Sequence, residues 1–153
     1  MKKTLFLLLC LCTATAQAHI YNVKDFGAKA DGKTIDSHAI NHAIREATAN
    51  GGGTVYLPAG NYACYSIRLA SHIHLLMEQG TVITAAFPSA TEGYDEAEPN
   101  EHNRYQDYGH SHWKNSLIWS IGLEDITISG PGLIDGHGLT REESRLPGVG
   151  NKA

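Results

Sequence analysis

The residues best suited to binding a ligand gather in one polar segment, residues 92–113. Four of them carry aromatic or imidazole rings that could contact a ligand: Tyr105, Tyr108, His112 and Trp113. Aromatic rings present flat apolar faces on which sugar rings stack, and recognition residues commonly lie on loops held by a rigid scaffold. We therefore assign these four side chains to substrate binding. The competing interpretation is a solvated insertion that packs on the flank of the fold.

Acidic residues and histidines in the same segment raise the question of a metal site. The acids are Glu92, Asp95, Glu96, Glu98 and Glu101, and the histidines are His102, His110 and His112. Their spacing is irregular, whereas metal-binding motifs space their ligands closely and regularly. We predict no metal site and no cofactor. The acids also disfavour a polyanionic ligand at this loop, because like charges repel.

Residues 1–18 have the form of an export leader. Lys2 and Lys3 supply positive charge, residues 5–12 are apolar but too short for a membrane span, and residues 16–18 read Ala-Gln-Ala. This order is typical of a signal peptide cleaved after a small-x-small site. We expect a mature chain, residues 19–153, that is secreted or periplasmic. The alternative is an uncleaved anchor or a buried N-terminal helix.

Composition narrows the class of protein further. The chain has 153 residues, of which 42% are hydrophobic and 18% charged, with a formal net charge of −4. That length suits one domain with a hydrophobic core. A nucleic-acid-binding domain normally carries a basic face, so the acidic balance argues against one. After the leader, no stretch approaches the ~20 apolar residues of a membrane span.

The elements that must position any site begin with a helix at residues 36–49. Its apolar residues recur at steps of three and four: Ala39, Ile40, Ala43, Ile44 and Ala47. This period places one apolar stripe on a helix. Asp36 is a plausible N-cap, and Asn50-Gly51 a plausible stop signal. The remaining positions, including His38, Asn41 and His42, are expected to form a solvated face.

Beyond the helix the apolar period changes from 3.6 to 2. Short runs rich in β-branched residues are separated by Gly, Asn, Asp or Ser, which predicts strands. The runs are 54–57, 62–69, 73–77, 82–84, 116–119, 126–128 and 133–134. Cys64 lies in one of them, and we predict a buried thiol with no nucleophilic role.

Two segments resemble each other. Ile73-x-Leu75 is followed by a glycine and two apolar residues, and Ile126-x-Ile128 is followed by the same pattern, 53 residues later. No two-residue Asn-Gly or Asp-Gly hairpin turn joins the strands. Recurring strands without hairpins favour a solenoid with stacked coils, which the helix would cover at one end. An antiparallel sandwich fits the number of strands as well.

Two motifs in the first half resemble the opening of pectin-degrading β-helix enzymes. Residues 22–40 read NVKDFGAKADGKTIDSHAI, and residues 51–62 read GGGTVYLPAGNY. The family pattern is V-x-D-F-G-A-x-x-D-G-x-T-x-D-[ST]-x-A-I, then a helix, then G-G-G-T-V-x-[LF]-P-x-G-x-Y. Polygalacturonases, rhamnogalacturonases, epimerase-like proteins and phage tailspikes share it, so it does not by itself name a reaction.

The second half is similar to bacterial polygalacturonases of glycoside hydrolase family 28. Residues 115–119 read NSLIW, and residues 123–136 read LEDITISGPGLIDG, close to the family's N-x-x-N-V-T-I-x-G-x-G-x-I-D-G-x-G. The resemblance implies an all-β fold, the right-handed parallel β-helix. It also implies that this chain holds the N-terminal helical cap and the first coils of that β-helix.

The catalytic motifs that the resemblance implies are missing. Family 28 enzymes carry Asn-Thr-Asp, Asp-Asp, Gly-His-Gly and Arg-x-Lys. The chain contains no Asn-Thr-Asp, Asp-Asp or Arg-x-Lys. Gly136-His137-Gly138 continues the Ile-Asp-Gly coil signature, so we interpret it as a tight turn whose glycines supply positive φ. We expect the catalytic residues to lie beyond Ala153, in later coils of a longer enzyme, and this chain alone to be inactive.

The expected function is therefore that of an exported polygalacturonase-type glycosidase that acts on pectic polysaccharide by inverting hydrolysis. Two alternatives remain. One is a β-helix lyase that uses calcium and an Arg or Lys base. The other is a non-catalytic β-helix of tailspike or adhesin type that binds polysaccharide. In each case the partner is a polysaccharide of the pectin or polygalacturonate type, with no nucleic acid and no membrane after leader removal.

Overall fold

The structure, a computed structural model, describes residues 19–97, 114–136 and 139. The predicted leader, residues 1–18, lies outside this described part. So do the predicted binding residues Tyr105, Tyr108, His112 and Trp113, and the turn residue His137. Those assignments remain predictions. No helix in the described part is long and apolar enough to cross a membrane.

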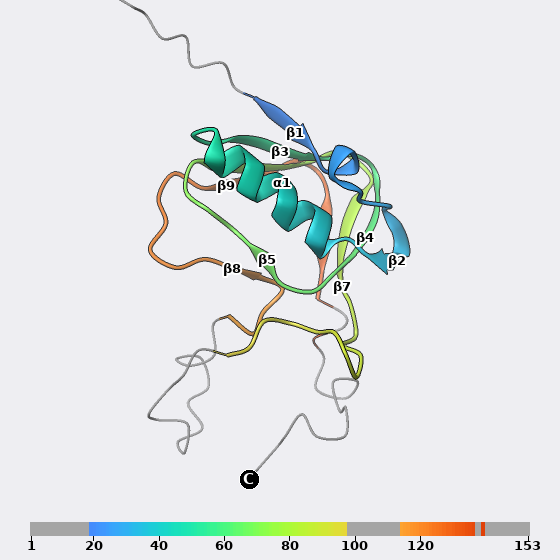
Figure 1. Cartoon of the computed structure of the whole chain (residues 1–153). Coiled ribbons are helices and arrows are strands. Elements are labelled where there is room, and N and C mark those ends of the chain that lie inside the picture. The colour runs from blue at the N-terminus through green and yellow to red at the C-terminus, as the bar shows by residue number, and fades with distance from the viewer. Residues whose placement is uncertain (1–18, 98–113, 137–138, 140–153) are drawn as a thin grey trace, which may run out of the picture.

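Ten short strands, one 3-10 helix and one α-helix make up the described part (Figure 1). The strands are β1 (Ile20–Asn22), β2 (Asp31–Ile35), β3 (Gly53–Leu57), β4 (Gly60–Cys64), β5 (Ile67–Arg68), β6 (Ile73–Met77), β7 (Thr81–Ala85), β8 (Ile118–Trp119), β9 (Thr127–Ser129) and β10 (Leu133–Asp135). The helices are η1 (Val23–Phe26) and α1 (Ser37–Ala49). The protein is therefore mostly β, as predicted.

The strands form three parallel sheets. The first sheet has the order β1-β3-β6-β9, the second β10-β7-β4-β2, and the third joins β5 to β8. Every strand pair among the described residues is parallel. Each pass of the chain thus adds one strand to the first sheet and the next strand to the second, as in β3–β4, β6–β7 and β9–β10. This excludes the antiparallel sandwich for the described part.

The strand register confirms the internal similarity found in the sequence. His74 pairs with Thr127 and Leu75 with Ile128, so β6 and β9 lie side by side at the predicted offset. In the second sheet, Val82 pairs with Leu133. Parallel neighbours with the same apolar pattern place equivalent residues on the same face, because side chains alternate between faces along a strand.

The core lies between the sheets and under α1. Its largest fully buried side chains include Tyr62, Leu57, Leu75, Ile83, Ile40 and Ile44. The helix begins at Ser37, ends at Ala49 and packs against β3 and β5 (Figure 1). Cys64 is buried as predicted, and desolvation raises the pKa of its thiol.

The polar contacts of two helix residues differ from expectation. Asp36 occupies the N-cap position of α1, as predicted, but with φ −93° and ψ −7° its side chain makes no capping bond to the helix. Its buried carboxylate instead accepts the backbone N–H groups of Lys29 (2.7 Å) and Ala30 (2.8 Å). Asn41 is buried rather than solvated, and its amide bridges α1 to β5 through the Ser66 carbonyl and the Arg68 N–H, each at 2.8 Å.

Candidate functional site

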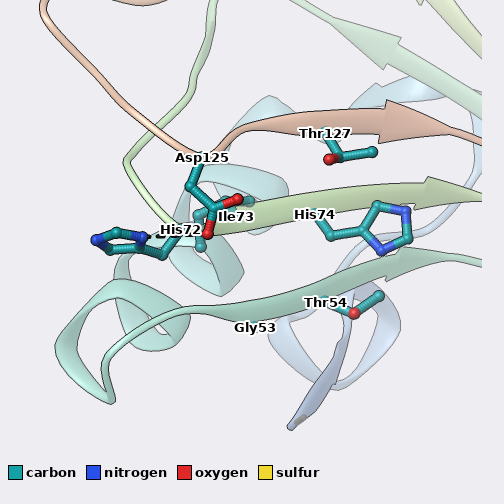
Figure 2. A pocket seen from close by; sticks show the side chains of 7 residues that line it. All are labelled: Gly53, Thr54, His72, Ile73, His74, Asp125 and Thr127. Carbon is teal, nitrogen blue, oxygen red and sulfur yellow. Dashed lines mark hydrogen bonds and ion pairs between the residues drawn. The ribbon is translucent and has the colours of Figure 1, made fainter.

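An open pocket of about 170 Å³ lies on the outer side of the first sheet, where β3, β6 and β9 begin. Figure 2 shows the side chains that line it. They are Gly53, Thr54, His72, Ile73, His74, Asp125 and Thr127. The lining residues thus come from three successive passes of the chain.

Strand register explains why three of these residues share one face. Thr54, His74 and Thr127 lie at the same position of β3, β6 and β9. The next residues along two of these strands, Val55 and Leu75, are fully buried. Because side chains alternate, the preceding residues must face outward. The pocket floor is therefore a row of polar side chains across the sheet.

His72 and Asp125 occupy the turns just before the strands and have left-handed backbones, with φ of 61° and 55°. Gly52 stands at the corresponding place before β3, with φ of 109°. A Cβ on Gly52 would lie 2.5 Å from the carbonyl oxygen of His72, so only glycine fits there. The stacked turns hold His72 and Asp125 together, with Nδ1 3.3 Å from Oδ2.

The charges at this pocket are exposed. His72 Nε2 also lies 3.8 Å from Glu124 Oε1, and the side chains of all three ionisable residues are more than half exposed. Ion pairs of this kind contribute at most about 1 kcal/mol to stability. Deeper on the sheet, His74 Nε2 lies 2.7 Å from the hydroxyl oxygen of Ser129.

This pocket is a poor catalytic centre for a sugar polymer. Its volume is below the roughly 300–1,000 Å³ of usual ligand pockets. Asp125 is the one carboxylate among the residues that line it, whereas inverting hydrolysis needs two. Among the described residues, no three His, Cys, Asp or Glu side chains are grouped so as to hold a metal ion.

A second polar cluster lies on the third sheet, and we call its four residues, Arg68, Asp95, Lys114 and Trp119, the Asp95 cluster. Arg68 donates from Nε to Asp95 Oδ2 at 2.7 Å and from Nη2 to Asp95 Oδ1. Trp119 Nε1 donates to Asp95 Oδ2 at 2.8 Å. Lys114 Nζ lies 5.5 Å from the centroid of the Trp119 ring.

The scaffold fixes this cluster from beneath. Arg68 and Trp119 are register partners on the parallel strands β5 and β8, and Ile67 beside them is fully buried. The Arg68 backbone is tied to α1 through Asn41. The hydroxyl of Ser66 accepts the Asp95 N–H at 2.9 Å and donates to the Ser116 carbonyl at 2.8 Å. The helix, the sheet and both sides of the 98–113 segment therefore meet here.

Charge-assisted bonds shift the pKa values of the pair. The bonds from Arg68 lower the pKa of Asp95, and Trp119 and the nearby charge of Lys114 lower it further, while partial burial opposes them. The bond to Asp95 raises the pKa of Arg68 in turn. Because bidentate Arg–carboxylate pairs are strong and directional, both groups stay ionised and fixed in place.

Sequence reasoning missed both clusters. The 53-residue offset already places His72 opposite Asp125 and was a usable signal. Alternation on β5 places Arg68 outward beside the apolar Ile67, but nothing local indicates that Asp95 binds it. The predicted residues Tyr105, Tyr108, His112 and Trp113 lie outside the described residues, so the structure does not bring them together or separate them.

Comparisons with known proteins give a consistent picture. Residues 20–129 match the family described as rhamnogalacturonase A/epimerase, pectate lyase-like. A Vitis vinifera protein named "Probable polygalacturonase" is 31% identical over 139 residues, which are 81% of this chain and 26% of the relative. Alginate lyase 7 of Azotobacter vinelandii is 47% identical over 81 residues, which are 50% of this chain and 10% of the relative.

Solved structures agree at the level of the fold. An exopolygalacturonase from Thermotoga maritima superposes with a TM-score of 0.66 at 24% identity, over 88% of this chain and 31% of that one. A family 28 exopolygalacturonase from Yersinia enterocolitica superposes with a TM-score of 0.58 at 30% identity, over 79% of this chain and 21% of that one. The chain thus spans between a tenth and about a quarter of the two curated relatives.

Proposed function

This chain belongs to the rhamnogalacturonase A/epimerase, pectate lyase-like family, and from that premise we propose that it is the N-terminal scaffold of an exported polygalacturonase-type enzyme. The substrate is a pectic polysaccharide and the reaction is hydrolysis with inversion. The observation that carries the proposal is the parallel register of the first and second sheets, which gain one strand each with every pass of the chain.

In this proposal the sheets are the first coils of a right-handed parallel β-helix. A coil stack exposes apolar residues at its ends unless something covers them. The helix α1 lies against β3 and β5, with Ile40 and Ile44 buried, which supports its role as the cap of one end. At β9 and β10, Ile128 and Ile134 are partly exposed among the described residues, although their partners Leu75 and Ile83 are fully buried. A further coil stacked on β9 and β10 would bury them.

The catalytic acids belong to such later coils. Inverting hydrolysis uses two carboxyl groups about 6.5–9.5 Å apart, one of which stays protonated as the general acid. A general acid needs a raised pKa. In the described part, three carboxyl groups have a pKa that is lowered and not raised: Asp31, Glu78 and Asp95. Backbone N–H groups lower the pKa of Asp31, and the Tyr56 hydroxyl lowers that of Glu78.

The test is the reaction of the complete secreted protein with polygalacturonate. Hydrolysis gives reducing ends without unsaturated products, and proton NMR of the first product shows inversion at the anomeric carbon. Mass spectrometry of the exported protein should give His19 as its first residue. Reducing ends with retained anomeric configuration would contradict the inverting mechanism, and a retained Met1 would contradict export through a cleaved leader.

A lyase or epimerase is the second candidate, supported by the 47% identity to alginate lyase 7. A lyase would release unsaturated uronates, with an absorbance that hydrolysis products lack. An epimerase would change the sugar composition without shortening the polymer. A protein that binds polygalacturonate but does none of these would be a non-catalytic β-helix. The same assay therefore separates the four outcomes.

A further inference from the structure

The Asp95 cluster holds an arginine with one binding edge already used and one edge remaining. A guanidinium is planar and presents two edges for carboxylates, one formed by Nε and Nη2 and the other by Nη1 and Nη2. Asp95 occupies the first edge. Covalent geometry then directs the second edge away from Asp95. The Arg68 side chain is 55% exposed while that of Asp95 is 18% exposed, so the second edge lies toward solvent.

An aromatic ring lies on the strand next to Arg68. Trp119 is the register partner of Arg68 on the adjacent strand. Neighbouring strands are about 4.8 Å apart, so one sugar ring can reach both side chains. The indole N–H is bound to Asp95, which fixes the orientation of the ring, and Lys114 brings a second cation near it. Carbohydrate rings stack on such faces, and the cations suit an acidic sugar.

We propose that Arg68, Lys114 and Trp119 form a subsite for one uronate residue of an acidic polysaccharide. The sugar carboxylate binds the Nη1–Nη2 edge of Arg68, the ring lies against the indole, and the Lys114 ammonium adds a second positive charge. This inference deepens the proposed function and rests on it, because it supplies a binding group for the acidic polymer. No family motif contributes to it, since the chain contains no Arg-x-Lys.

Asp95 acts as the positioning residue of this subsite. The uronate binds the edge of Arg68 that Asp95 does not use, so Asp95 does not compete with it for those N–H groups. The bonds of Asp95 hold Arg68 and Trp119 in place before a ligand arrives, and such preorganisation reduces the entropy lost on binding. Because the pKa of Asp95 is lowered, the arrangement persists in mildly acidic solution. Exposed Glu92 and Glu96 lie nearby in the chain and limit the affinity.

The experiment measures binding of trigalacturonate to the 153-residue chain by intrinsic fluorescence. Trp113 is replaced by Phe, which keeps an aromatic ring at that predicted binding position and leaves Trp119 as the one tryptophan. We expect saturable binding that weakens with salt, because exposed charges are screened. Galactotriose, which has the same length and no carboxylate, should bind at least about tenfold more weakly, a loss of about 1.4 kcal/mol.

Two variants in the cluster and one outside it test the assignment. Arg68→Gln should weaken trigalacturonate binding about tenfold or more, and Lys114→Gln about threefold, because exposed single charges contribute less. Arg45→Gln, on the exposed face of α1, is the matched control and should bind like the parent. Lys114→Gln leaves every bond to the Asp95 carboxylate in place, so it stays informative if Arg68→Gln fails to fold.

The inference is wrong if Lys114→Gln and a folded Arg68→Gln both bind like the parent, or if galactotriose binds as tightly as trigalacturonate. If Arg45→Gln weakens binding as much as Arg68→Gln does, the attraction is nonspecific, and the inference is also wrong. Hydrolysis by the complete protein is measured separately. If the complete protein hydrolyses polygalacturonate but the cluster variants bind like the parent, only this subsite is rejected. If the variants lose binding but the complete protein does not hydrolyse the polymer, only the proposed reaction is rejected.

Discussion

Strands β6 and β7 differ from strands β9 and β10, although the two pairs carry the same apolar pattern. Leu75 and Ile83 on the inner pair are 0% exposed, while their register partners Ile128 and Ile134 are 40% and 41% exposed. The inner strands have a neighbour on both sides, and the outer ones end their sheets among the described residues. Burial of an inward residue is thus decided by the next strand, and the apolar pattern alone does not ensure it.

The largest effect is expected from a comparison of the end covered by α1 with the end at β9 and β10. Ile44→Asp would bury an unpaired charge beneath the helix, which is severely unfavourable, and should abolish cooperative folding. Ile134→Asp places the same charge at a partly exposed position and should cost about 1 kcal/mol. Thermal unfolding followed by circular dichroism measures both. Equal melting temperatures for Ile44→Asp and its parent would contradict the packing of α1.

Cavity-forming substitutions sharpen the same comparison within one register pair. Leu75→Ala removes fully buried methyl groups and should lower the free energy of unfolding by about 2–5 kcal/mol. Ile128→Ala should cost less than half as much in this chain, because the side chain already contacts solvent. Urea unfolding gives both values. If the two losses are equal, β9 is as well covered as β6. In a longer protein with a further coil, the Ile128→Ala loss should rise toward that of Leu75→Ala.

A pH titration tests the bonded cluster on the third sheet. Since the folded-state pKa of Asp95 is lowered, its contribution to stability is present above its unfolded pKa of about 3.9 and is lost as pH falls through the lowered value. Asp95→Asn should therefore be less stable than the parent at pH 7, and the difference should shrink on acidification below about pH 4. Urea midpoints across this range measure it. A difference that grows toward low pH would contradict the shift.

The smallest effect is expected at the exposed His72–Asp125 pair, which joins the inner β6 to the outer β9. His72→Ala should change the free energy of unfolding by no more than about 1 kcal/mol, because exposed ion pairs contribute little. His72→Gly removes the pair as well but relieves the left-handed backbone, so it should be at least as stable as His72→Ala. A loss well above this range in either variant would mean that the turns, and not the strands, hold β9 in place.

Much of the fold could be predicted because its signals are local or periodic. The apolar stripe of α1 predicted the burial of Ile40 and Ile44, and the 53-residue similarity predicted the alignment of β6 with β9. The lack of hairpin turns indicated parallel pairing. In contrast, β1 and β2 were missed. Strand β1 has only three residues. Strand β2 contains Asp31 and Gly32, residues that disfavour strands, so its pairing with β4 prevails over local preference.

The sequence by itself determined which apolar residues face inward, because side-chain alternation and helical period are properties of the local backbone. The polar contacts were decided only by the tertiary structure. Asp36 binds the loop at Lys29 and Ala30 instead of capping α1, and Asn41 reaches strand β5. Asp95 meets Arg68 and Trp119 across separations of 27 and 24 residues. A buried polar side chain forms its hydrogen bonds with the groups that the packed strands bring within about 3 Å. Those groups are distant in the chain, so no local sequence pattern indicates them.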